Sequence, residues 1–284
     1  MKKTPLLICL SLLCLHASAQ RLHLGLFGGI SAYNGDLTEK IYPRKLTNGA
    51  IGITASYELS DQLMLRSGLT YAVVGGADRY NKSADLVSRN LSFETSITEF
   101  SLTGEYYLRN LYEYKLSPYG FAGLAVFRFN PYTYDGSGER VFLKPLSTEG
   151  QGIAGYTTKP YSLTQLAIPF GGGLKYAINN NLRIGLEVGM RKLFTDFLDD
   201  VSGNYADETD LINARGTLSA AMAYRGDEAP GGSLLYPDKG AQRGSPKYKD
   251  IYYFTGIHLT YRLNAAAGKN PLRMNRNGCP VNIY

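Results

Sequence analysis

Eight segments of the chain alternate polar and apolar residues with a period of two. In residues 49–59, Ile51 and Ile53 fall on one side of an extended chain, whereas Thr54 and Glu58 fall on the other. Successive side chains of a β-strand point to opposite faces, and a tilted strand of about 9–11 residues crosses a bilayer. The pattern therefore predicts membrane-spanning strands with one face toward lipid.

The predicted strands are separated by residues typical of turns. They cover residues 21–31, 49–59, 63–73, 96–108, 119–129, 165–176, 183–191 and 256–263. The phase of the fifth strand depends on one charge, because an inward-facing Arg128 predicts that three aromatic residues face lipid. These residues are Phe121, Phe127 and Phe129. In the sixth strand, Pro169 has no backbone N–H to donate and predicts a local irregularity in the ladder.

Short and long links alternate between these segments. Residues 60–62, 109–117 and 179–181 make the short links, and residues 32–48, 75–92, 130–162 and 196–249 make the long ones. An even number of antiparallel strands puts both chain ends on the periplasmic side, with the long links outside. We therefore expect an all-β fold: an eight-stranded antiparallel transmembrane outer-membrane β-barrel with long extracellular loops and short periplasmic turns.

Composition agrees with this fold class but does not select it alone. The chain has 32 Gly, 23 Tyr and 11 Phe and lacks Trp, which suits strands, tight barrel corners and interfacial aromatic girdles. A soluble β-sandwich has similar preferences, yet it would not require links that alternate in length. Beyond residue 20 no stretch approaches the roughly 20 apolar residues of a membrane helix, which excludes a helical membrane protein.

The first 19 residues have the pattern of a cleaved signal peptide. Lys2 and Lys3 precede an apolar run over residues 6–15, and small residues at the end of the segment give a cleavage site after Ala19. We expect an exported barrel over 20–263, located in the outer membrane, and a periplasmic tail over 264–284. Loss of the two lysines lowers the formal charge from +6 to +4, too weak an excess to indicate a nucleic-acid partner.

Inward-facing charges are expected to pair inside the barrel. An eight-stranded barrel has an interior just wide enough for side chains or one small ligand, and unpaired charge in a closed interior is costly. The charged residues that we expect in a structural ion network are Arg66, Glu99, Glu105, Arg128, Glu187, Arg191 and Arg262, together with Glu58, Lys175 and Arg183. The alternative is a catalytic carboxylate pair among Glu99, Glu105 and Glu187, which cationic neighbours disfavour by keeping the carboxylates ionised.

Two histidines remain after cleavage, and they bear on an enzyme hypothesis. His23 and His258 point inward on the first and last strands, which are neighbours in a closed barrel. Neither histidine lies beside a recognisable nucleophile motif, so we interpret both as hydrogen-bonding groups of the lumen. No catalytic residue and no cofactor is predicted.

The last long link carries an acidic cluster and a helical pattern. Asp196, Asp199 and Asp200 could bind calcium, but their spacing lacks an EF-hand pattern, so turn formation and helix capping are favoured and no metal site is predicted. Apolar residues near helical spacing predict one short amphipathic helix in the same link. They are Leu211, Ala214, Leu218 and Met222.

Five sequence segments carry a family resemblance. They are FGGISAYNGDL at 27–37, TEGQG at 148–152, IPFGGG at 168–173, RKLFTDFLDDVSGNY at 191–205 and RGSP at 243–246. Together they resemble the PorG-like barrels of Bacteroidota over nearly the whole mature chain. The resemblance implies a component of the type IX secretion system, in which the barrel associates with a periplasmic ring that contains a lipoprotein.

The resemblance and the barrel pattern lead to one function hypothesis and two alternatives. The hypothesis is a non-enzymatic membrane anchor and scaffold component of a type IX secretion assembly, with outer-membrane lipid and periplasmic ring proteins as partners. The first alternative is a small ligand-binding or narrow transport barrel. The second is an outer-membrane lipid-modifying enzyme.

The C-terminal segment offers a partner-binding hypothesis. Residues 264–284 are basic, with Lys269, Arg273 and Arg276, and we expect them to bind a periplasmic partner. Two of the 3 cysteines leave with the signal peptide, so Cys279 is left without an internal disulfide partner and could bond to another protein in an oxidising compartment. The alternative is a tail without a partner and an unpaired thiol.

Overall fold

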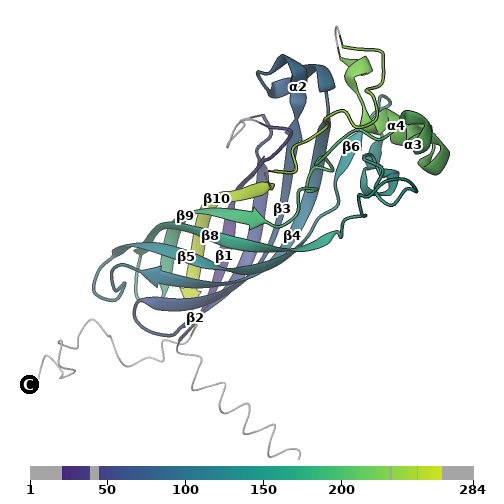
Figure 1. Ribbon diagram of the computed structural model, residues 1–284. Helices are drawn as coiled ribbons and strands as arrows, with labels where there is room; N and C mark the ends of the chain where they lie inside the picture. Colours follow the sequence, from purple (N-terminus) through teal and green to yellow (C-terminus); the bar gives the residue numbers. More distant parts are fainter. Residues whose placement is uncertain (1–20, 39–44, 230–231, 248, 264–284) are drawn as a thin grey trace, which may run out of the picture.

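The computed structural model describes residues 21–38, 45–229, 232–247 and 249–263. Eight long antiparallel strands form a closed barrel (Figure 1). They are β1 (Leu22–Asn34), β2 (Asn48–Glu58), β3 (Leu63–Ala77), β4 (Ser92–Tyr107), β5 (Leu116–Arg128), β8 (Thr164–Ala177), β9 (Leu182–Leu193) and β10 (Ile251–Arg262). The predicted signal peptide, its cleavage site and the C-terminal tail lie outside the described residues.

Two pairings close the sheet on itself. Strand β1 pairs with β10 from His23↔Arg262 to Asn34↔Ile251, and β3 pairs with β4 from Leu63↔Tyr106 to Ala77↔Ser92. Every barrel strand therefore has a hydrogen-bonded neighbour on both sides. Lipid offers no hydrogen bonds, so only such a closed sheet can cross a bilayer in strands. The closed eight-stranded barrel confirms the predicted fold class.

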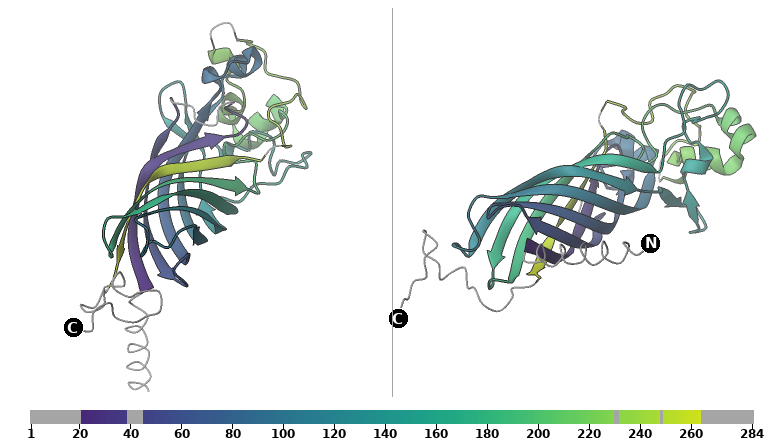
Figure 2. Two further views of the ribbon diagram at one scale, coloured as in Figure 1. Left: turned by 90° about the vertical axis from the view of Figure 1, so that its left-hand side faces the viewer. Right: turned by 90° about the horizontal axis from the view of Figure 1, so that it is seen from below.

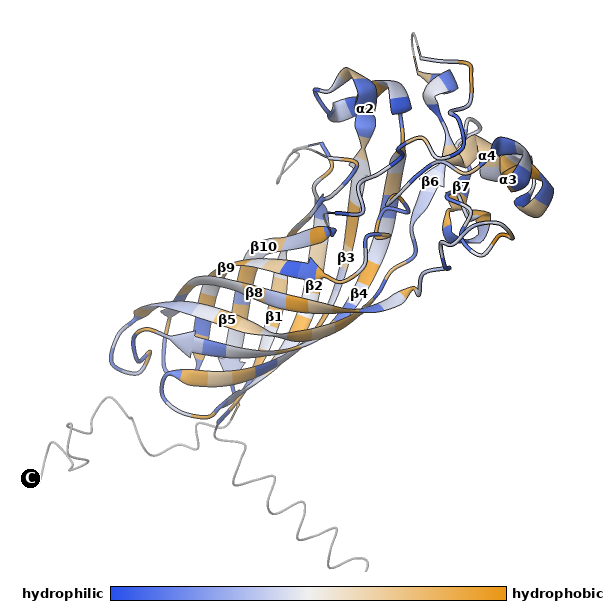
Figure 3. Ribbon diagram, in the orientation of Figure 1, coloured by the Kyte–Doolittle hydropathy of each residue, from blue (hydrophilic) through white to orange (hydrophobic). Residues whose placement is uncertain are grey.

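The outer surface of the barrel is an apolar belt. The alternation predicted from the sequence is visible along the strands (Figure 3), and the outward side chains include Ile51, Leu124 and Leu186, which are 67%, 68% and 62% exposed. Other members of the belt are Leu24, Leu26, Ile53, Leu69, Tyr71, Phe100, Leu102, Tyr106, Leu166, Leu174, Val188, Ile257 and Leu259. Water would not stabilise so large a continuous apolar surface. The belt is the lipid-facing surface of a transmembrane barrel.

The predicted phase of the fifth strand is wrong. Phe121, Phe127 and Phe129 are buried inside the barrel, whereas Leu124 and Val126 of β5 face outward. Arg128 follows the outward set and is exposed. Both faces of this strand carry apolar residues, so the alternation contains no polar face that fixes its phase. Arg128 is the last residue of β5, where an outward guanidinium can reach water beyond the hydrocarbon.

The irregularity expected at Pro169 is confirmed. The pairing of β5 with β8 runs as far as Ala122↔Phe170 and resumes at Ala125↔Ala167, so the residues between them, including Pro169, are unpaired on that side. On its other side Pro169 pairs with Arg191 of β9. Proline interrupts one ladder because it cannot donate a backbone hydrogen bond.

The links separate into two ends of the barrel. The links 59–62, 108–115 and 178–181 lie at one end, the turn end, and the longer links gather beyond the other, the loop end (Figure 2). The loop end contains η2 (Asp78–Tyr80), α2 (Ala84–Arg89), β6 (Tyr132–Tyr134), β7 (Arg140–Phe142), η3 (Lys144–Leu146), α3 (Glu208–Arg215), α4 (Thr217–Ala223) and η4 (Gly226–Glu228). Among the described residues, no helix has the length and apolar character that crossing a membrane requires.

The single helix expected in the last long link is two helices. Gly216, with φ of 88°, separates α3 from α4 and changes the direction of the chain. Leu211 and Met222 are buried as expected, but Ala214 and Leu218 are exposed. A helical period cannot be continued through a residue in the left-handed region, so the second helix starts a new phase.

Substitution on the lipid face tests the assignment of the belt. Leu186→Arg should lower the free energy of unfolding in phospholipid bilayers by about 2–4 kcal/mol, because the guanidinium must enter the hydrocarbon. The matched control is Leu234→Arg, since Leu234 is 85% exposed at the loop end; it should change the value by less than about 0.5 kcal/mol. Urea titration of both variants measures the difference, and equal stabilities would contradict a lipid-facing Leu186.

Candidate functional site

Side chains fill the barrel interior, and their chemical character changes along the length of the barrel. A lumen ion network of paired charges occupies the part nearest the turn end. An apolar plug of aromatic and aliphatic side chains follows. Buried polar contacts among the long links, the loop cap, lie above the plug at the loop end.

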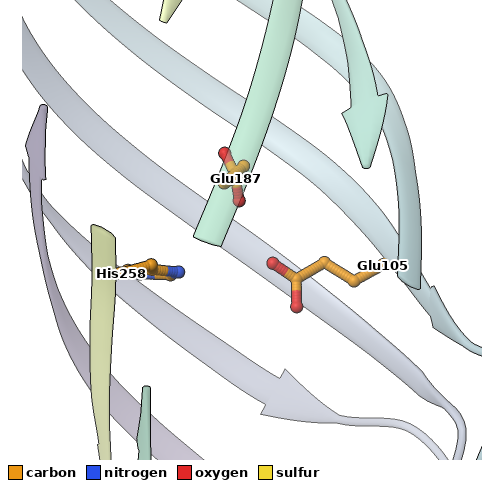
Figure 4. Close-up of side chains that lie close together, drawn as sticks. All are labelled: Glu105, Glu187 and His258. Atoms are coloured by element: carbon orange, nitrogen blue, oxygen red, sulfur yellow. The ribbon is translucent and has the colours of Figure 1, made fainter. Parts of the chain in front are cut away.

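Arg66 is the centre of the lumen ion network. Its Nη1 lies 2.8 Å from Glu105 Oε1 and 2.6 Å from Glu187 Oε2, and its Nη2 donates to Glu187 Oε1 at 3.2 Å. The three residues come from β3, β4 and β9 and are nearly inaccessible to solvent. Figure 4 shows Glu105 and Glu187 close together in the lumen, on different strands. One guanidinium thus bridges two buried carboxylates from different strands.

Lys175 and two tyrosines complete this centre. Lys175 Nζ lies 3.4 Å from Glu105 Oε2 and donates to Tyr107 Oη at 2.6 Å. Tyr107 donates to Glu105, and Tyr119 donates to Glu187 Oε2 at 2.7 Å. Two cations and two carboxylates therefore balance one another, and each tyrosine adds a hydrogen bond to a carboxylate oxygen that also contacts a cation.

A second group of charges closes the turn end of the lumen. Glu58 accepts from His23 Nε2 at 2.8 Å and from Arg183 Nη2 at 3.1 Å, and it also accepts from Tyr112 Oη. Arg262 Nη2 lies 3.7 Å from Glu58 Oε2. The guanidiniums of Arg183 and Arg262 lie 5.0 and 5.1 Å from the centroid of the Tyr112 ring. Tyr112, from the β4–β5 link, therefore covers this mouth of the barrel.

A third pair lies beneath the plug. Arg191 donates from Nε to Glu99 Oε2 at 3.1 Å and from Nη2 to Glu99 Oε1 at 3.3 Å. Tyr252 donates to Glu99 Oε2 at 2.6 Å, and the Arg191 guanidinium lies 4.1 Å from the Phe254 ring centroid. The pair thus joins the ionic part of the lumen to its aromatic part.

The structure brings most of the predicted network residues together. Those that line the lumen are Arg66, Glu99, Glu105, Glu187, Arg191 and Arg262, with Glu58, Lys175 and Arg183. Arg128 is outside the barrel, because it follows the outward face of β5. The tyrosines of the network are not among the residues predicted from the sequence. Tyr107 is two residues from Glu105 on the same strand and so points to the same face, which the alternating pattern predicts. Tyr112 lies in a link and follows no alternating pattern.

One cluster in the network has the composition of a metal site. One ligand atom each from Glu105, Glu187 and His258 lie within 4.8 Å of one another (Figure 4). Arg66 Nη1 contacts both carboxylates and is 3.4 Å from His258 Nδ1, while His258 Nε2 is 2.8 Å from Thr54 Oγ1. A divalent cation would have to displace the guanidinium, so the residues fit an ion network better than a metal centre.

The apolar plug fills the lumen toward the loop end. Phe127, Phe129 and Tyr252 are fully buried there. The Phe127 and Phe129 rings stack with centroids 5.5 Å apart, and Phe129 stacks on Tyr161 of a long link at 6.1 Å. Further members are Phe27, Tyr33, Val74, Phe93, Ile97, Leu193, Leu198, Val201 and Phe254. Interiors packed in this way have few voids larger than a water molecule, so the plug separates the lumen from the loop end.

Arg243 is the main cation of the loop cap. Its Nη1 donates to Glu149 Oε1 at 2.9 Å and to the backbone oxygen of Asp200 at 2.7 Å, and its Nε donates to the backbone oxygen of Ala223 at 3.1 Å. Nearby, the backbone N–H of Ser245 donates to Asp36 Oδ2 at 2.9 Å. Four of the five segments that carry the family resemblance therefore meet in the loop cap, although they are far apart in the sequence.

The acidic residues of the last long link accept hydrogen bonds within their own turns and from other long links. Asp199 Oδ1 accepts from the backbone N–H of Val201 at 2.9 Å, and Asp196 Oδ2 accepts from Ser202 Oγ at 2.8 Å. Asp200 accepts from Thr148 Oγ1 at 2.6 Å and from Tyr161 Oη at 2.7 Å. These contacts match the expected role in turns and extend it to contacts between links.

Two buried carboxylates share one hydroxyl in the loop cap. Tyr33 Oη donates to Asp199 and lies 3.2 Å from Asp250 Oδ1. The pKa of Asp199 is raised well above its ordinary value, mainly by burial and next by the nearby Asp250 carboxylate. The pKa of Asp250 is also raised well above its ordinary value, mainly by burial and next by the Asp196 carboxylate. Burial also raises the pKa of Asp36 to about 6.

Removal of Arg66 should destabilise the barrel strongly. Arg66→Met leaves Glu105 and Glu187 buried without their shared cation, and such a loss costs about 3–5 kcal/mol. The matched control is Arg128→Met, which removes an outward-facing guanidinium and should cost less than about 0.5 kcal/mol. Urea unfolding in uncharged detergent micelles compares the two. Equal losses would show that Arg66 does not neutralise the buried carboxylates.

The loop cap should lose stability as pH rises. A carboxyl whose pKa is raised in the folded state contributes stability below its unfolded pKa, and this contribution is lost as pH rises through the folded value. For Asp36 the loss lies between about pH 4 and pH 6, and for Asp199 and Asp250 it extends to higher pH. Hydrogen exchange of cap amides, corrected for intrinsic rates, should therefore show less protection at pH 8 than at pH 5.

Two variants separate this effect from general pH dependence. Asp199→Asn removes one ionisable group from the buried pair and should restore part of the cap protection at pH 8. Asp85→Asn changes an exposed residue of α2 and should leave the pH dependence as it is in the wild type. Cap protection that rises with pH in the wild type would contradict the burial of uncompensated carboxyls.

Comparisons with known proteins give one family match and several distant fold matches. A family model described as a domain of unknown function (DUF6089) matches residues 2–219. No curated protein matches the sequence.

Solved structures with a similar fold include three small barrels. Neisserial surface protein A is 10% identical with a TM-score of 0.42, over 85% of this chain and 97% of its own. Ail, the attachment invasion locus protein of Yersinia pestis, is 9% identical with a TM-score of 0.40, over 85% and 97%. The outer membrane protein OprG of Pseudomonas aeruginosa is 10% identical with a TM-score of 0.39, over 86% and 98%.

Proposed function

Because the chain belongs to the family described as a domain of unknown function (DUF6089), we propose its role from its own geometry and from the motif resemblance given above. It is a non-enzymatic outer-membrane barrel that serves as membrane anchor and scaffold component of a type IX protein secretion assembly. The signal peptide is cleaved after Ala19, the turn end faces the periplasm and the long links face the exterior. Its partners are membrane lipid and periplasmic ring proteins, including a lipoprotein.

The filled interior is the observation that carries this proposal. Tyr112 covers the turn end of the lumen, Arg66 and its carboxylate partners occupy the middle, and the plug around Phe127 occupies the rest. The described lumen therefore offers a transported solute no open path, and its carboxylates are engaged by cations instead of facing a substrate. This favours an anchor over a narrow transport barrel and over a lipid-modifying enzyme.

The turn end offers a surface for periplasmic contacts. The β2–β3 turn and the β4–β5 link form an open recess of about 560 Å³, lined by Asp61, Gln62, Leu108, Arg109, Asn110, Glu113 and Tyr114. The tail over 264–284 follows β10, whose last residue is at the same end. In this proposal the recess and the basic residues Lys269, Arg273 and Arg276 contact the ring proteins, and Cys279 forms an intermolecular disulfide.

Site-specific crosslinking in intact envelopes tests the proposed contacts. A photoreactive amino acid in place of Tyr114, which is 52% exposed, should give adducts with periplasmic proteins, a lipoprotein among them. The same group in place of Leu234, at the loop end, should give none of these adducts. Separately, non-reducing gels should contain a thiol-sensitive adduct that Cys279→Ser removes.

Each contact has its own contradicting result. Absence of any adduct from position 114, in envelopes that contain the assembled secretion machinery, would overturn the scaffold role. Absence of a thiol-sensitive adduct would remove only the disulfide with Cys279.

A further inference from the structure

The β6–β7 hairpin presents one aromatic face away from the barrel. Its register pairs Tyr132 with Phe142 and Tyr134 with Arg140, so these four side chains share a face. On the opposite face Thr133 is buried, and its Oγ1 lies 3.1 Å from Ser92 Oγ and 3.0 Å from Arg225 Nη1. The hairpin is thus fixed to the barrel and to η4 by one face. On the other face, the free face, Tyr134, Arg140 and Phe142 are exposed, whereas Tyr132 is only 8% exposed.

The free face continues the lipid-facing surface of two barrel strands. Tyr132 pairs with Glu94 of β4 and donates to Glu94 Oε2 at 2.9 Å. Glu94 has the same parity as Phe100, Leu102 and Tyr106, which belong to the apolar belt. Arg128, which pairs with Thr98 of β4, likewise follows the outward residues of β5. We call Arg128, Tyr132, Tyr134, Arg140 and Phe142 the lipid strip.

The lipid strip begins at the edge of the hydrocarbon and extends beyond it. From Leu108 to Thr98 the chain advances about 25 Å along the membrane normal, at about 3.3 Å per residue and a tilt of about 40°, which equals the height of a typical apolar band. Glu94 is four residues beyond Thr98 along β4, or about 10 Å beyond that edge. Tyr132 of β6 pairs with Glu94 and lies at the same height. A phospholipid headgroup layer is only about 5–8 Å thick. A lipid that covers the strip therefore needs a larger headgroup.

The side chains of the lipid strip suit a headgroup with sugar rings and acidic groups. Tyr134 and Phe142 are 42% and 43% exposed, and aromatic faces pack against the C–H faces of sugar rings. Arg128 and Arg140 are exposed, and the Arg140 guanidinium lies 4.5 Å from the Tyr132 ring centroid. Guanidinium groups bind phosphate or carboxylate through two parallel hydrogen bonds.

The nearby carboxylates are bound by other groups and do not pair with Arg128 or Arg140. Glu94 accepts from Tyr132 Oη, and Asp135 Oδ1 accepts from the backbone N–H groups of Ser137 and Glu139 in the hairpin turn. The ion pairs found in the described part of the chain do not include Arg128 or Arg140.

We propose that the lipid strip binds the headgroup of an anionic glycolipid in the outer leaflet, with Arg128 and Arg140 on its acidic groups and the exposed rings of Tyr134 and Phe142 on its sugar rings. The inference rests on the proposed function only in taking the loop end as exterior. The site holds the barrel at a fixed depth and rotation against a rigid leaflet.

Native mass spectrometry of the full mature chain in detergent tests the site. With lipid A, a bisphosphorylated glycolipid, as the probe, the wild type should retain bound lipid, and Arg128→Gln/Arg140→Gln should weaken binding at least tenfold. The matched control is Lys45→Gln/Arg79→Gln, which removes two exposed cations that lie 5.0 and 5.2 Å from the Tyr80 ring centroid elsewhere at the loop end. It should retain lipid A like the wild type.

Two further measurements distinguish a glycolipid headgroup from a phospholipid and from free phosphate. Phosphatidylglycerol should bind at least tenfold more weakly than lipid A, and inorganic phosphate should not displace lipid A. Equal retention by the two double variants, or equal binding of phosphatidylglycerol, would overturn the proposal. Displacement by phosphate would show a site for free anions and would overturn it as well.

A labelling arm separates this inference from the proposed function. In a Cys279→Ser background, Ser137→Cys at the hairpin turn should react with a membrane-impermeant maleimide on intact cells. Absence of labelling would show that the loop end faces the periplasm, and would overturn the proposed orientation and the outer-leaflet site together. Labelling without lipid A binding would overturn the lipid site alone.

Discussion

The narrow interior of an eight-stranded barrel is the constraint on which this structure depends. The sheet is closed by the β1–β10 and β3–β4 pairings, which leaves room inside for side chains but little for water. Charges that point inward must therefore find partners inside. Arg66 of β3 provides a partner for two charges at once, because its guanidinium contacts Glu105 on the neighbouring strand β4 and Glu187 on β9.

The same constraint extends from the lumen to the loops. Above the ion network the interior is apolar, and Phe129 continues the packing to Tyr161 in a long link. Arg243 then joins the links to one another through Glu149 and the backbone of Asp200. Barrel and loops therefore form one packed unit. A unit of this kind is suited to hold a fixed position in the membrane for other proteins, and less suited to pass a solute.

Much of the barrel follows from the sequence, because most strands carry charged or small residues on one face and apolar residues on the other. The fifth strand does not, and the one charge that indicates a phase, Arg128, has its side chain outside the barrel. The network carboxylates and most of its cations were predictable from parity, but Tyr112 was not, since it reaches the lumen from a link. The cap around Arg243 depends on contacts between distant segments, which a local pattern cannot reveal even though the segments themselves stand out.

Conductance in planar lipid bilayers tests the sealed interior most directly. Purified protein inserted into a bilayer should give no stable conductance steps under an applied voltage, because the ion network and the plug fill the lumen. A reproducible ohmic conductance that scales with salt concentration would mean that ions pass through the barrel. That result would contradict the filled interior and remove the main argument for an anchor.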